Sequence, residues 1–194
     1  MRCPECLQRI HAGAEECPHC GVTFDVLKQK FSNLSKVVHG GVHDLAGVLR
    51  SGMRKQVMDS VEKCEKRFSN ISVAISMVAL DDGVTLESFG MWLLNEGEFR
   101  RTSGDRCGEG RVVIIIDVKR RSACLCYGYL MDGLVREGES FDVLTAGHAS
   151  LLEGEYVRGC EQILQSLKRY LEKVWKRSIR GEKALAKAMK GAGK

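Results

Sequence analysis

Two pairs of cysteines near the N-terminus carry the clearest chemistry in this chain. The sequence reads Cys-Pro-Glu-Cys at residues 3–6 and Cys-Pro-His-Cys at residues 17–20, with ten residues between the pairs. Each Cys-x-x-Cys knuckle directs two thiolates and backbone N–H groups to one point, so two knuckles can surround one Zn²⁺ tetrahedrally. The predicted zinc ligands are Cys3, Cys6, Cys17 and Cys20.

Two other interpretations of this segment stay open. A redox Cys-x-x-Cys pair is the rival to metal binding, although two copies in one short segment favour the metal. His11 and His19 could replace a thiolate, but exposed polar positions on a zinc ribbon explain them more simply. A segment this short has almost no core, so the metal must supply much of its folding free energy.

A second candidate site consists of carboxylates placed around predicted strands. Asp81 and Asp82 close one strand, Asp105 and Glu109 lie in the loop before another, and Asp44 opens the main domain. Carboxylate oxygens at strand ends could hold Mg²⁺ or Ca²⁺ and polarise a phosphoester. The alternative is structural, because Asp-Asp-Gly is an ordinary turn and a loop is polar in any case.

The remaining cysteines supply one further nucleophile candidate. Cys107 lies in a loop beside Arg106, which favours the reactive thiolate form. Cys124 and Cys126 fall on one face of a predicted strand, and Cys64 falls on the apolar face of a predicted helix. We therefore expect these three to be core thiols.

Three histidines outside the ribbon are interpreted as structural. His39 and His43 flank the Gly40-Gly41 pair, where a loop position is more typical than metal ligation. His148 lies on the apolar stripe of a predicted helix, and we expect it to be a buried or half-buried packing residue.

The composition is typical of a soluble protein, and its basic residues are concentrated at the C-terminal end. Of the 194 residues, 44% are hydrophobic and 28% are charged, and no apolar run is long enough to span a bilayer. The N-terminus lacks the apolar core of a signal peptide, and nine cysteines without such a signal favour metal or free thiols, so we expect a cytoplasmic location. Residues 158–194 hold eleven Lys or Arg against three Asp or Glu. This end could bind an acidic partner or nucleic acid, or it is the solvated face of a terminal helix.

The predicted elements alternate between strands and helices around one apolar strand. Val112–Ile116 is a β-branched run typical of a strand covered on both faces. A short charged connection joins it to residues 122–127 in a hairpin, whose turn should expose Lys119, Arg120 and Arg121 to water. Apolar spacing predicts helices over residues 25–38, 52–68, 85–93, 139–152 and 156–174, a strand over 71–80 and a polar loop over 98–110, and Thr85 can cap the third of these helices. The result is an α/β fold with a mixed sheet, in which the crossover strands are parallel and the hairpin is antiparallel.

Five segments share the order and spacing of a known family pattern: Val42–Leu49, Thr85–Phe89, Gly110 with Val112–Ile116, Tyr127-Gly128, and Leu151–Tyr156 with Gly159. Together they resemble the TPM-domain family of thylakoid-lumen, photosystem-repair and receptor-modulator proteins. The resemblance covers roughly residues 42–175.

The resemblance implies a three-layer α/β/α sandwich. It also implies divalent-cation binding and, for some members, phosphatase activity, whereas other members act as assembly or repair factors. The chain departs from the family pattern at Cys107–Gly110, which replaces an acidic Asp-Asn-Gly, and at Cys126, which replaces a glycine. The first of these departures weakens any transfer of the metal or phosphatase site.

We therefore expect a zinc ribbon over residues 1–24, a helical linker over 25–41, a TPM-like α/β domain over 42–177 and a basic extension over 178–194. The expected function is that of a cytoplasmic protein-interaction or assembly module whose zinc ribbon binds a protein partner. The alternative is a divalent-metal-dependent phosphatase that uses the carboxylates named above. Whether these carboxylates converge in space distinguishes the two.

Overall fold

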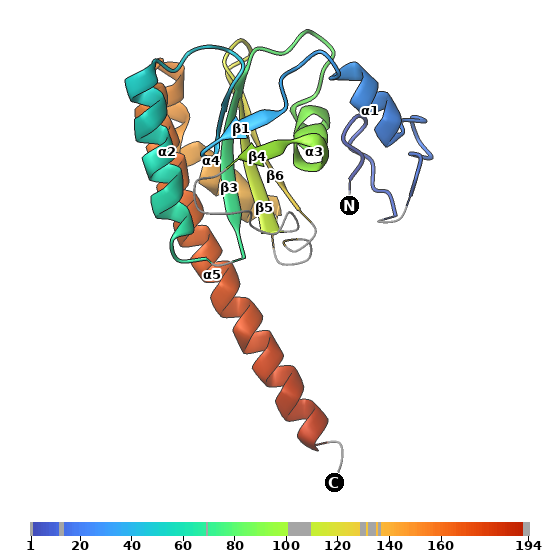
Figure 1. Cartoon of the computed structure of the whole chain (residues 1–194). Coiled ribbons are helices and arrows are strands. Elements are labelled where there is room, and N and C mark those ends of the chain that lie inside the picture. The colour runs from blue at the N-terminus through green and yellow to red at the C-terminus, as the bar shows by residue number, and fades with distance from the viewer. Residues whose placement is uncertain are drawn as a thin grey trace.

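The computed structural model describes residues 2–11, 14–68, 70–100, 110–128, 131, 135 and 137–191. In chain order the elements are α1 (Phe24–Lys30), β1 (Val37–His39), β2 (Val42–Asp44), α2 (Ser51–Glu65), β3 (Ser72–Val78), α3 (Leu86–Glu96), β4 (Glu98–Arg100), β5 (Arg111–Asp117), β6 (Ser122–Tyr127), α4 (Glu137–Leu152) and α5 (Tyr156–Gly191). They form an α/β/α sandwich over a mixed sheet, next to the cysteine-rich N-terminal segment (Figure 1). The predicted fold class is confirmed.

The apolar strand β5 lies inside the sheet, whose strand order is β4-β1-β2-β3-β5-β6. It pairs in parallel with β3 and antiparallel with β6, as the crossover and hairpin predicted. Val112–Ile116 are buried on both faces of the sheet. The turn of the hairpin exposes Lys119, Arg120 and Arg121 to solvent, also as predicted.

Helices cover both faces of this sheet and divide the core into two clusters (Figure 1). The larger cluster joins one face of β3 and β5 to α2, α4 and α5. The smaller cluster joins the other face to α1 and α3, and it contains the packed rings of Phe31, Phe89 and Trp92. The small residues of β3, including Ala74 and Ser76, are fully buried, so both faces of this strand are covered.

The predicted helix over residues 25–38 is wrong in its second half. Helix α1 begins after the N-cap Thr23, rather than at Asp25, and ends at Lys30. Val38 is fully buried, but it reaches the same cluster as Leu27 from strand β1. Leu27 and Val38 match a helical spacing although Val38 lies in a strand, because a helix and the strand that follows it can bury residues in the same cluster.

The Gly40-Gly41 pair makes the turn between β1 and β2 instead of ending a helix. Both glycines have positive φ, 56° and 80°, which is the conformation that a tight hairpin turn requires. Strand β1 also pairs in parallel with β4, a strand that lies within the region predicted to be loop. The prediction of a helical linker up to residue 41 is therefore corrected to a short helix and a sheet strand.

Helix α4 buries a face that is rotated from the predicted one, although Leu144 and Leu151 of the predicted stripe are half-buried against the larger cluster. Its buried positions are Val143, Gly147 and Ser150, a helical spacing built partly on small residues. Phe141 is 67% exposed, and His148 is exposed rather than packed. The rotation arises because Gly147 is the contact residue against α5, which a search for large apolar residues does not detect.

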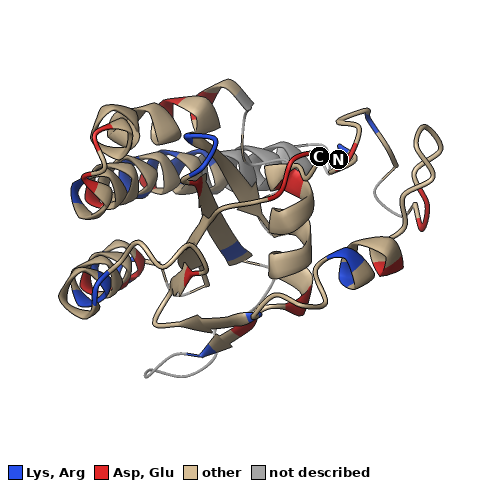
Figure 2. Ribbon diagram, turned by 90° about the horizontal axis from the view of Figure 1, so that it is seen from above, with Lys and Arg blue, Asp and Glu red and all other residues tan. Residues whose placement is uncertain are grey.

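The predicted apolar stripe of α5 is confirmed from Cys160 to Val174, whose apolar members are buried against the sheet. Helix α5 then runs on past the sheet and away from the body of the fold (Figure 1). Charged residues lie along the outer sides of the helices and in the loops, whereas the strands between the layers carry few (Figure 2). No helix among the described residues is both long enough and apolar enough to cross a membrane.

Candidate metal centre

The four cysteines predicted as zinc ligands converge. One ligand sulfur from each lies within 4.8 Å of all the others, and His11 and His19 are not part of this group. The Cys3–Cys20 and Cys6–Cys17 Sγ atoms are 3.6 Å and 3.7 Å apart. A tetrahedron with zinc–sulfur bonds of about 2.3 Å has edges of about 3.8 Å, so the spacing fits one Zn²⁺. The thiols come from the knuckles at Cys3, Cys6, Cys17 and Cys20.

The two knuckles repeat one backbone arrangement fourteen residues apart. Cys3 N–H donates to the Gln8 carbonyl oxygen at 2.9 Å, and Cys17 N–H donates to the Val22 carbonyl oxygen at 3.0 Å. Each knuckle then closes on a residue with positive φ, which is Gly21 in the second and Leu7 in the first. A leucine in this conformation is strained, which is consistent with a backbone held in place by the site.

Backbone N–H groups of the second knuckle favour the thiolate form. Burial raises the pKa of the Cys17 thiol, but hydrogen bonds from the backbone N–H groups of His19 and Cys20, together with contacts to the Cys3 and Cys20 thiols, outweigh it and lower this pKa to about 6. The contacts between the thiols act in the opposite sense on Cys20 and raise its pKa. Thiolate is the form that binds metal. The local backbone therefore suits a cation between the four sulfurs.

The first knuckle is attached to the α/β domain at the N-terminal end of α3. The Pro4 carbonyl oxygen lies 2.8 Å from Thr85 Oγ1 and 3.0 Å from Ser88 Oγ. Thr85 is also the predicted N-cap of α3, where it accepts a hydrogen bond from Ser88 N–H. An ion pair between Lys30 and Glu5, at 2.7 Å, ties the same knuckle to α1.

The carboxylate candidates that the structure describes serve the fold. The side chain of Asp44 is 1% exposed, and its oxygens accept hydrogen bonds from Val48 N–H and Leu49 N–H. Asp81 and Asp82 are exposed, and Asp82 lies 3.3 Å from Lys119 Nζ. Among the described residues, the cysteines form the one group with metal-binding geometry. Asp105 and Glu109 lie outside the described residues.

His43 is a buried core residue instead of a loop histidine. Its Nε2–H donates to the Ser35 carbonyl oxygen at 2.7 Å, so its Nδ1, 2.9 Å from Ser76 Oγ, accepts from that hydroxyl group. Burial lowers the pKa of His43. Both nitrogens of the neutral ring are thus satisfied by the protein, which leaves neither for a metal. His39 is exposed.

The three cysteines that were predicted to be core thiols pack in the core. Cys64 is buried, and Cys124 and Cys126 pack partly buried on the core beneath α3, as their strand positions predicted. Burial raises the pKa of Cys64 to about 12, which makes it an inert thiol. Cys107 lies outside the described residues.

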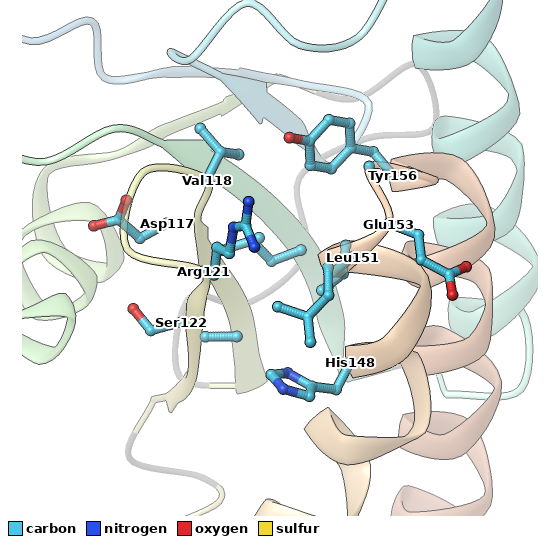
Figure 3. A pocket seen from close by; sticks show the side chains of 12 residues that line it. Asp117, Val118, Arg121, Ser122, His148, Leu151, Glu153 and Tyr156 are labelled. Carbon is cyan, nitrogen blue, oxygen red and sulfur yellow. The ribbon is translucent and has the colours of Figure 1, made fainter.

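Sequence reasoning did not anticipate a cavity on the domain. It has a volume of about 310 Å³ and lies between the turn of the β5–β6 hairpin and the corner that joins α4 to α5 (Figure 3). His148, Arg121 and Tyr156 are among its lining residues. The only signal in the sequence was the charge of the hairpin turn, which exposure to solvent already explains.

No protein-family model matches the chain, and no curated protein sequence matches it significantly. Similar solved structures exist. One is the N-terminal domain of the cg2496 protein from Corynebacterium glutamicum, determined by NMR, with a TM-score of 0.50 and 13% identity over 67% of this chain and 78% of that chain. Another is the N-terminal domain of a protein from P. gingivalis, with a TM-score of 0.49 and 14% identity over 68% and 82%. These likenesses concern the fold alone.

Proposed function

We propose that this protein is a zinc-ribbon module for protein interaction or assembly, carried on an α/β domain of TPM type. The observation that supports it best is that the two knuckles, which have the same backbone arrangement, differ in their contacts with the rest of the protein. The first is attached to α3 through the buried Pro4, whereas Pro18, the matching residue of the second knuckle, is exposed. His19 and Cys20 beside it are also exposed. The ribbon is thus fixed on one side and open on the other, as a surface held out to a partner would be.

Zinc has a structural role in this proposal. The four thiols offer the closed coordination of a structural site, with no position left for water or substrate. Because the ribbon has little core of its own, the ion stabilises the knuckles in the arrangement that presents Pro18 and His19.

The carboxylates support the interaction module over the phosphatase alternative. Asp44 is enclosed by backbone N–H groups and by Arg54, 3.8 Å away, so it is not free to bind a second metal. Asp82 is engaged with Lys119 at the surface. We therefore propose that the acidic residues that the structure describes in this domain do not assemble a Mg²⁺ or Ca²⁺ site.

The basic C-terminal extension is proposed as a second, charge-based contact. Five of the eleven basic residues between positions 158 and 194 lie in this extension, and they could attract an acidic protein or nucleic acid in the cytoplasm. Such an association must weaken steeply with added salt.

We also propose that the chain divides into a ribbon, an α/β domain and a basic extension from residue 178. The domain start moves from residue 42 to a point before Val37, because β1 pairs with both β2 and β4. A truncation that removes residues 1–40 would delete this strand, so β4 would lose the strand with which it pairs and β2 would pair with β3 alone. Removing residues 1–22 keeps the whole sheet and also α1, whose Leu27 is buried in the smaller cluster, so circular dichroism should show a folded domain.

A capture experiment with surface variants tests the interaction proposal. The double substitution Pro18→Ala with His19→Ala changes the open knuckle without touching a predicted ligand, and His11→Ala is the control at another exposed ribbon position. We expect the double variant to lose partners that the wild-type protein and the control retain, with the zinc content unchanged in all three. Equal retention by all three proteins would contradict the proposed binding face.

A hydrolysis assay tests the alternative. With p-nitrophenyl phosphate and added Mg²⁺ or Ca²⁺, we expect no turnover that depends on the candidate carboxylates. Hydrolysis that is lost in Asp81→Asn with Asp82→Asn, but kept in Asp59→Asn, would support the phosphatase instead.

A further inference from the structure

The cavity of about 310 Å³ lies where ligands often bind in open α/β sheets. Strands β2, β3 and β5 are parallel, and the cavity opens at the C-terminal end of β5, next to Asp117 and Val118. Its opposite wall is formed by the end of α4 and the start of α5 (Figure 3). Its volume is that of a small-molecule site.

Arg121, which is exposed to solvent, supplies a positive charge to the lining of this cavity. Among the described residues its guanidinium group has no ion-pair or hydrogen-bond partner, unlike its neighbours Lys119 and Arg120. Its backbone has a φ of 53°, a left-handed conformation that favours glycine. A long cationic side chain at a position that suits glycine is better explained by what the side chain binds than by the turn itself.

Polar groups from the facing corner join Arg121. In Figure 3, Arg121 reaches from the hairpin turn toward this corner, with Tyr156 on one side and His148 on the other. Tyr156 is the first residue of the 36-residue helix α5, whose free N–H groups and dipole favour an anion at this end. The imidazole, the phenol and the guanidinium can all donate hydrogen bonds.

The acidic residues near the cavity do not oppose a bound anion. Asp117 accepts hydrogen bonds from Lys119 N–H and Arg120 N–H, and Arg120 Nε lies 2.6 Å from its Oδ2. Glu155 is paired with Arg158 at 3.0 Å. Glu153 is exposed and directs its carboxylate away from Arg121 (Figure 3).

Apart from Ser122 and Gly154, the rest of the lining is apolar and comprises Ile116, Val118, Ala123, Leu151 and Leu152. We propose that this cavity binds a small organic molecule that carries a phosphate group, with Arg121, His148 and Tyr156 around the phosphate and the apolar wall against the rest of the ligand. A tetrahedral anion offers several acceptor oxygens, which matches donors that approach from three directions. This site is independent of the ribbon and of any hydrolysis.

Isothermal titration of the full chain with phenylphosphonate, which has no ester bond to hydrolyse, tests the proposal. We expect Arg121→Gly to weaken binding at least about tenfold, the effect of losing one charge-assisted contact. This variant should fold at least as well as wild type, because glycine suits a φ of 53°. Lys119→Ala removes an equal charge from the same turn but does not line the cavity, so it should change binding less than about twofold.

His148→Gln provides a second variant at an exposed position, and binding should weaken in it as well. Inorganic phosphate should bind more weakly than phenylphosphonate, because it leaves the apolar wall unused. Benzoate, which has the same ring but a planar anion, should also bind more weakly. Equal losses in Arg121→Gly and Lys119→Ala, no binding of phenylphosphonate, or tighter binding of either comparison anion would overturn the proposal.

Discussion

Replacing Gly147 with alanine tests how closely α4 and α5 pack at the corner beside the cavity. A Cβ at this position would lie 2.3 Å from the Gly159 carbonyl oxygen and 2.7 Å from Ile163 Cγ1. Real Cβ atoms do not approach other heavy atoms within 3.0 Å, so something must move. Because the nearer atom belongs to the backbone of α5, a side-chain rotation cannot relieve the clash, and the two helices must separate.

The expected change in the free energy of unfolding combines a loss from overpacking with a gain from helix propensity. Overpacking of a core costs about 1–3 kcal/mol, and the backbone contact places this site at the upper end of that range. Alanine recovers up to about 1 kcal/mol through its helix propensity. We therefore expect Gly147→Ala to lower the free energy of unfolding by about 2 kcal/mol, which corresponds to a fall in melting temperature of about 4–8 °C for a chain of this size.

Urea and thermal unfolding measure this effect, with Gly138→Ala as the control. Gly138 lies in the same helix, but a Cβ there would meet nothing within 4 Å. The control should be as stable as wild type or more stable by up to about 1 kcal/mol. If Gly147→Ala proves as stable as Gly138→Ala, the helices do not approach as closely as the structure places them.

Three further predictions concern the ribbon and the buried histidine. Leu7→Gly should relieve a positive φ and raise the apparent zinc affinity about fivefold, or about 1 kcal/mol, in a chelator competition, whereas Leu7→Ala should bring no such gain. Ser88→Ala should loosen the ribbon by about 1 kcal/mol through loss of the contact with Pro4, seen as faster hydrogen exchange in the first knuckle but not in α2. Burial lowers the pKa of His43 in the folded protein below its usual 6.5, so its contribution to stability is present above pH 6.5 and is lost as the pH falls below it, by at most about 1.4 kcal/mol per pH unit. In His43→Gln the urea midpoint should change less between pH 7 and pH 5 than it does in the wild type. An equal change in both proteins would contradict the buried neutral ring.

Local patterns were enough to predict the parts of the fold that depend on neighbouring residues. The β-branched run of β5, the capping Thr85 and the stripe of α5 each carry a signal within a few positions, and each was located correctly. The cysteine spacing also brought the four thiols to one place, because the knuckle geometry is local.

The predictions from the sequence were wrong where contacts between distant segments determine the local structure. The pairing of β1 with β4 joins segments about sixty residues apart, and nothing near Val38 indicates that it leaves a helical pattern. The buried face of α4 depends on the close approach of Gly147 to α5, so Phe141 and His148 were placed on the wrong side. The attachment of Pro4 to Thr85 and Ser88, and the cavity around Arg121, likewise require the folded chain.

The zinc content of protein purified without chelator tests the central claim most directly. Elemental analysis should give one zinc per chain in the wild type and in Cys126→Ser, whose thiol lies in β6 outside the group of four. Cys17→Ser should lose most of this zinc, together with the folded ribbon. Full stoichiometry in Cys17→Ser, or no zinc in the wild type, would contradict the four-thiolate site on which the account is built.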